Sequence, residues 1–84
     1  MTFAIAVHYL KGGPPVEAWA IYEGHDRYFV RHLVISPSGR VTPRRTEHVS
    51  SLERARERVP PGTRRYPRDD GDEDGLVETW VALD

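Results

Sequence analysis

Residues 16–35 read VEAWAIYEGHDRYFVRHLVI, and they carry the clearest strand pattern in this 84-residue chain. Within residues 16–23, Trp19 and Ile21 recur at the two-residue period of a half-buried β-strand. Residues 28–35 are rich in β-branched and aromatic side chains and predict a second strand. The segment between them holds Gly and Asp, which favour turns. Two antiparallel strands joined by a tight turn are therefore expected.

The flanking sequence predicts two further strands. Side chains alternate from Thr2 to Leu10, and the breaker sequence KGGPP at residues 11–15 ends this strand. The sequence SPSG at residues 36–39 predicts a turn, after which residues 40–42 are expected to pair back only as a short extension. Residues 76–83 predict the last strand, which carries Trp80.

One helix is expected from Ser50 to Val59. Ser50 and Glu53 fit a capping box, and the sequence PPG that follows residue 59 forces the helix to end. A narrow apolar stripe is expected to pack on the sheet: Leu52, Ala55 and Val59.

These elements predict an α+β fold with two layers: a mostly antiparallel four-stranded sheet and one short helix, in the order β-β-β-α-β. A right-handed crossover would place the last strand beside the strand at residues 2–10. The chain is expected to form a single small domain over residues 1–84, with a polar loop at residues 60–75.

The composition narrows the classes of function. The chain has no cysteine, so disulfide scaffolds, thiolate chemistry and Cys-type zinc sites are excluded. The apolar run Phe3–Val7 is far shorter than a membrane span and lacks the basic residues of a signal peptide before it. We therefore expect a cytoplasmic protein that does not bind membranes.

Charge is unevenly distributed along the chain, although the formal net charge is only −1. Residues 40–68 hold nine arginines against three glutamates, whereas residues 69–84 hold seven acidic residues and no basic one. The arginine block suggests a nucleic-acid-binding surface as an alternative function. A competing explanation of the arginine block needs no nucleic acid: residues 69–74 neutralise the same arginines within the molecule. The arginines that would contact phosphates are Arg44, Arg45, Arg54, Arg58, Arg64 and Arg65.

An acidic turn is the sharpest local motif. Asp70, Asp72 and Asp74 are followed by a glycine, as at the start of a calcium-binding loop, where alternate carboxylates converge on one ion. The twelfth position of such a loop needs a bidentate Glu, and here it is Val81. A solvated acidic turn is therefore preferred, and calcium is the only cofactor that the sequence suggests.

The third function, and the preferred one, is protein binding without catalysis. The sequence contains no nucleophile elbow, phosphate-binding loop or zinc-protease motif, and a domain this small offers little room for an enclosed active site. One short helix covers only one face of a sheet, so large side chains remain for a partner protein or a homodimer. The expected contact residues are Trp19, Phe29, Trp80, Arg54 and Arg58.

Overall fold

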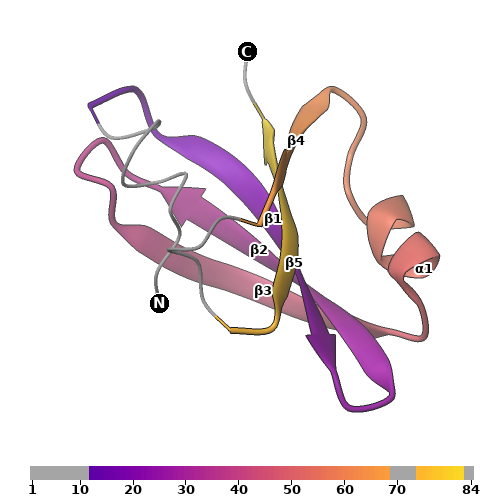
Figure 1. Ribbon diagram of the computed structural model, residues 1–84. Helices are drawn as coiled ribbons and strands as arrows, with labels where there is room; N and C mark the ends of the chain where they lie inside the picture. The colour runs from indigo at the N-terminus through magenta and orange to yellow at the C-terminus, as the bar shows by residue number, and fades with distance from the viewer. Residues whose placement is uncertain (1–11, 69–73, 83–84) are drawn as a thin grey trace.

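The computed structural model describes residues 12–68 and 74–82. They form a strongly twisted antiparallel sheet with one short helix beside it (Figure 1). Along the chain the elements are β1 (Val16–Gly24), β2 (Arg27–Ile35), β3 (Val41–Val49), α1 (Leu52–Glu57), β4 (Thr63–Pro67) and β5 (Leu76–Ala82). Within the described ranges, no helix has the length and apolar composition needed to cross a membrane.

The predicted hairpin is confirmed. Strands β1 and β2 pair without a break from Val16 opposite Ile35 to Gly24 opposite Arg27. The connecting turn places Asp26 at φ 59°, in the left-handed region that Asp tolerates better than most residues. The turn after β2 is also confirmed, because the Gly39 amide donates to the Ser36 carbonyl at 2.9 Å.

Within the described residues the sheet has five strands in the order β3-β2-β1-β5-β4, so the prediction of four strands is wrong, and residues 63–67 of the predicted polar loop at 60–75 form a strand instead. Residues 41–49 form a full edge strand rather than a short extension, and residues 63–67 form the opposite edge. Apolar and polar residues do not alternate in either segment. A strand at the edge of a sheet is held largely by backbone hydrogen bonds to its one neighbour, so its side chains need not follow this pattern.

The position of β5 is a second correction. It lies between β1 and β4 and pairs antiparallel with both, with Trp19 of β1 opposite Trp80, which differs from the predicted parallel crossover. The strand predicted at residues 2–10 lies outside the described residues. Because β4 follows the helix and turns back into β5, β5 runs opposite to β1 and no parallel crossover is needed.

Both faces of the sheet contain buried residues. We call the face that packs on α1 the helix-side face; its buried centre is Ile21 and Val30, in contact with Ala55 of the helix. The opposite face, here called the far face, has its own buried cluster: Ala18, Ala20, Tyr22, Leu33, Ile35, Leu76 and Val81. Because successive side chains of a strand point to opposite faces, the consecutive residues Ala20, Ile21 and Tyr22 of β1 are all buried when both faces are covered.

Helix α1 is shorter than predicted, and its N-cap lies one residue later than Ser50. Its N-cap is Ser51, whose side chain accepts a hydrogen bond from the Arg54 amide at 3.1 Å, so the predicted capping box of Ser50 and Glu53 is wrong. The expected apolar stripe is confirmed, with Ala55 buried and Leu52 and Val59 packed beside it. A helix of only six residues depends on this contact for its stability.

Candidate binding site

The strand register aligns one residue from each of the five strands. Arg65 pairs with Trp80 and Trp80 with Trp19, and on the other side Trp19 pairs with His32 and His32 with Arg45. Directly paired residues of neighbouring strands point to the same face of a sheet, and this is the helix-side face, where Trp19 and Trp80 pack. We call the set the cross-strand row: Arg65, Trp80, Trp19, His32 and Arg45.

The middle of the cross-strand row is an aromatic stack. The rings of Trp19 and His32 lie nearly parallel, with centroids 4.9 Å apart and an interplanar angle of 8°. The His32 Nε2 atom is buried and has no hydrogen bond, although Glu17 Oε1 lies 3.4 Å away. A distance of 3.4 Å without hydrogen-bond alignment is a weak polar contact, whereas the ring of His32 contacts Trp19 face to face.

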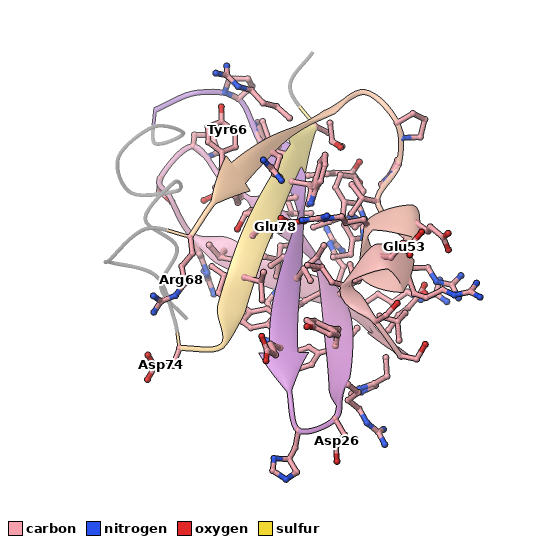
Figure 2. All side chains as sticks on the ribbon, turned by 45° about the vertical axis from the view of Figure 1, so that its right-hand side comes forward. Asp26, Glu53, Tyr66, Arg68, Asp74 and Glu78 are labelled. Atoms are coloured by element: carbon pink, nitrogen blue, oxygen red, sulfur yellow. The ribbon has the colours of Figure 1, made fainter. Side chains whose placement is uncertain are left out.

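A buried carboxylate supports one end of the row. Glu78 lies on β5 and faces α1 (Figure 2), where its carboxylate accepts hydrogen bonds from Arg56 Nε at 2.8 Å and Arg56 Nη2 at 3.1 Å. Trp80 Nε1 donates to the same carboxylate at 3.0 Å, and Arg65 Nη1 lies 3.8 Å away. The side chain of Glu78 is only 6% exposed, so these partners replace the water that it loses.

These partners also set the ionisation of Glu78. Burial raises the pKa of this carboxyl, but the hydrogen bonds from Arg56 and Trp80 and the charges of Arg56 and Arg65 outweigh burial. The pKa of Glu78 therefore lies below its ordinary value, and the carboxyl is ionised at neutral pH.

At the other end of the row, the carboxylate of Glu47 also lies beside two arginines. Its carboxylate lies 3.3 Å from Arg45 Nη2 and 3.5 Å from Arg58 Nε. Arg58 belongs to the end of α1, so the helix is tied to β3 through Glu47 and to β5 through Glu78. At each end two arginines share one carboxylate, which leaves the helix-side face with more positive than negative groups around the row.

A cavity opens beside the aromatic stack. It measures about 130 Å³ and lies where α1, β2 and β3 meet. We call it the row cavity; its lining residues are Trp19, Val30, His32, Arg45, Glu47 and Arg58. Its walls thus combine two guanidinium groups, one carboxylate and an aromatic surface, which is a combination suited to holding a charged group with an apolar stem. A second hollow of about 260 Å³ beside the β1–β2 turn includes no Trp among its lining residues.

The structure divides the predicted partner-binding residues between two faces. Trp19, Trp80 and Arg58 come together on the helix-side face. Phe29 instead stacks on Tyr22 at the far face, with ring centroids 4.9 Å apart. Arg54 is not among the residues that line the row cavity, and its guanidinium lies 3.7 Å from the Glu57 carboxylate. The predicted set is therefore not one surface.

The arginines predicted to bind nucleic acid are also dispersed. Arg44 and Arg45 lie on β3 and Arg64 and Arg65 on β4, at opposite edges of the sheet. Arg64 lies over the Tyr66 ring at 5.3 Å, and Tyr66 packs on the far face. Of the six, Arg45 and Arg65 belong to the cross-strand row and Arg58 lines the cavity beside it, and each of these three lies beside Glu47 or Glu78.

Most of the predicted calcium-binding turn lies in residues that the structure does not describe. Asp70 and Asp72 lie outside the described residues, whereas Asp74 is fully exposed and lies 3.7 Å from Arg68 Nη2 (Figure 2). In residues 12–68 and 74–82, no group of three or more His, Asp or Glu side chains has the geometry of a metal site.

Sequence reasoning missed His32, Glu47 and Glu78, which complete the row and its supports. No local pattern distinguishes them, because each lies within an ordinary strand segment and is brought to the row only by strand pairing.

No protein-family model matches the chain, and no curated protein or solved structure matches it either.

Proposed function

We propose that this protein is a non-enzymatic binding protein that contacts another protein chain through the cross-strand row. The observation that carries the proposal is the row itself, since the sheet aligns two tryptophans and a histidine between two arginines on one face. Trp and Arg are the residue types that most often dominate binding energy in protein interfaces. Both tryptophans remain partly exposed, so a partner can still bury more of their surface.

The outer strands of the described sheet, β3 and β4, are less suited to pairing with another chain. Strand β3 contains Pro43, carries Arg44 and Arg45, and has a register irregularity opposite His32 and Leu33. Strand β4 has only five residues and ends at Pro67. Proline, charge, short length and bulges are the features by which natural sheets avoid edge-to-edge association. A second copy of this chain is therefore also expected to bind at the helix-side face.

The second candidate is single-stranded nucleic acid. Trp19 and Trp80 with arginines on both sides resemble the stacking surfaces on which bases are bound. The competing observation is that Glu47 and Glu78 lie among these arginines and would repel a phosphate backbone. We therefore place protein binding first.

The proposal is tested by selecting peptides from a display library against the wild-type chain and measuring each selected peptide against variants. We expect Trp19→Leu and Trp80→Leu to weaken binding at least about tenfold, because each removes a large aromatic contact. Phe29→Leu is the matched control on the far face and should leave the affinities unchanged. The melting temperature of each variant verifies that it is folded.

Light scattering across micromolar concentrations tests the homodimer form of the same proposal. A dimer that Trp19→Leu dissociates and Phe29→Leu preserves would support binding through the row. A monomer for which no selected peptide depends on either tryptophan would contradict the proposal.

A further inference from the structure

We propose that the row cavity binds the carboxylate of a Glu or Asp side chain in an acidic segment of the partner protein. This inference rests on the proposed function, and it adds the chemistry that the partner must supply. It is drawn from the cavity beside the aromatic stack, from the arginines that line it and from an unsatisfied nitrogen in its wall.

The size of the cavity suits one side chain. At about 130 Å³ it is close to the volume of about 150 Å³ that accommodates a benzene ring in a protein interior. The side chains of Glu and Asp both have fewer heavy atoms than benzene. Val30 and the Trp19–His32 stack supply the apolar surface for its methylene groups.

The two arginines of the cavity are incompletely paired. Arg45 and Arg58 lie 3.3 Å and 3.5 Å from the single carboxylate of Glu47, which is longer than a strong charge-assisted hydrogen bond of about 2.7–2.9 Å. Arg56, in contrast, makes two hydrogen bonds to Glu78, at 2.8 Å and 3.1 Å. Each guanidinium group has five N–H donors, so Arg45 and Arg58 can bind a second carboxylate without releasing Glu47.

The arginines are also accessible to a ligand. The side chain of Arg45 is 75% exposed and that of Arg58 is 59% exposed, and they approach Glu47 from β3 and from the end of α1. Side chains from two different elements can therefore close on a carboxylate from two sides. The buried Nε2 of His32, which has no hydrogen bond, belongs to a residue of the same wall, and a ligand carboxylate accepts a hydrogen bond from it in the tautomer that carries the hydrogen on Nε2.

The charge balance favours a single carboxylate over a phosphate chain. Two arginines and one glutamate leave one positive charge in the cavity lining, which one carboxylate neutralises. A nucleic acid would bring several phosphates across the same face, where they would meet Glu47, Glu78 and Glu17. Repulsion between these carboxylates and the phosphates would oppose binding of a nucleic acid.

The probe for the test is the peptide acetyl-Ala-Ala-Glu-Ala-Ala-amide, with the Gln peptide of the same length as its control. Binding is followed by the NMR shifts of the Trp19 indole and the His32 imidazole of the full chain. The Glu peptide should produce saturable shifts and bind at least about fivefold more tightly than the Gln peptide, as expected for one charge-assisted hydrogen bond.

Matched arginine variants locate the site. Arg45→Ala and Arg58→Ala should each weaken the Glu peptide by about five- to tenfold. Arg44→Ala, on the same strand, and Arg54→Ala, at the helix, remove the same charge outside the cavity lining and should have no such effect. Equal binding of the Glu and Gln peptides, or equal weakening by the control variants, would overturn the inference. Tighter binding of an eight-residue oligothymidine would also overturn it, in favour of nucleic acid.

The outcome is distinguishable from failure of the proposed function. Selected partner peptides that need Trp19 but bind Arg45→Ala and Arg58→Ala normally would overturn the carboxylate site and leave the cross-strand row as the binding surface. A Glu peptide that binds at the cavity while no partner depends on Trp19 or Trp80 would support the carboxylate site alone.

Discussion

Glu78 is a buried acidic residue, unlike the acids on the protein surface. It is buried, and three donor atoms from Arg56 and Trp80 contact its carboxylate at 2.8–3.1 Å. Its position opposite Ile21 in the register places this carboxylate beneath the helix, where only charged or hydrogen-bonding partners can offset the loss of water. The same carboxylate orients the Trp80 ring and therefore one end of the cross-strand row.

Replacing Glu78 with Gln tests this role. Glu78→Gln keeps the volume but removes the charge that the Arg56 guanidinium meets, so we expect the free energy of unfolding to fall by about 1–3 kcal/mol. Urea denaturation measures the change. Glu57→Gln is the control, because Glu57 is exposed and lies 3.7 Å from Arg54, and it should change stability by less than about 0.5 kcal/mol. Equal losses in both variants would contradict a special role for Glu78.

The lowered pKa of Glu78 also predicts a pH dependence. A carboxyl whose pKa is lower in the folded state stabilises the protein above its ordinary pKa of 4.5, and this contribution is lost as the pH falls through the folded-state value. The stability difference between wild type and Glu78→Gln should therefore be largest above about pH 5 and shrink at lower pH. Urea midpoints of both proteins at several pH values measure it, and a difference independent of pH would show that the charge of Glu78 contributes nothing.

At the scale of elements, the stability of helix α1 depends on its contacts with the sheet. It has six residues and one buried side chain, Ala55, and it is held by its apolar stripe, by ion pairs to two strands and by its N-cap. Because the row cavity includes Arg58, the placement of the helix end also determines the geometry of the candidate site.

The N-cap offers a direct test of where the helix begins. Ser51→Ala removes the hydrogen bond to the Arg54 amide and should cost about 1 kcal/mol of unfolding free energy. Ser50→Ala changes the neighbouring exposed serine, which is the cap that a capping box with Glu53 would require. Denaturant unfolding of the two variants distinguishes the two starts, since a larger loss for Ser50→Ala would place the cap one residue earlier.

For the whole molecule, folding mixes charges that are separated along the chain. The basic block is interleaved with glutamates, because Arg45 and Arg58 meet Glu47 while Arg56 and Arg65 meet Glu78. These acids come from strands rather than from the acidic stretch at 69–74, from which the described part of the chain contributes the pair of Arg68 and Asp74. In the described part of the chain, these four arginines are therefore paired with glutamates instead of forming the unpaired stripe that favours phosphate binding.

This distribution predicts weak binding to nucleic acid. At about 150 mM salt, we expect no gel shift of single- or double-stranded DNA or RNA with protein up to about 100 μM. A clear shift with a steep salt dependence, weakened equally by Arg44→Ala and Arg45→Ala, would contradict it and would support the second candidate function.

Much of the fold could be predicted from local patterns. Strands β1, β2 and β5 and the apolar stripe of the helix follow from the alternation and spacing of apolar residues, since burial selects those side chains. Strands β3 and β4 could not be predicted in the same way. Sequences such as VTPRRTEHV and TRRYP lie at the edges, where backbone hydrogen bonds to one neighbour replace an apolar pattern.

The candidate site shows the same division. The residue types of Trp19, Trp80 and Arg58 are sufficient to suggest binding. Phe29 and Arg54 look equally suitable in the sequence, but Phe29 stacks on Tyr22 at the far face and Arg54 lies beside Glu57, outside the cavity lining. Only strand pairing determines that residues 65, 80, 19, 32 and 45 form one row, because a shift of one residue in any strand would turn its side chain to the far face. Local sequence thus specifies which segments are strands and helix, while the register between distant segments specifies the surface that they build.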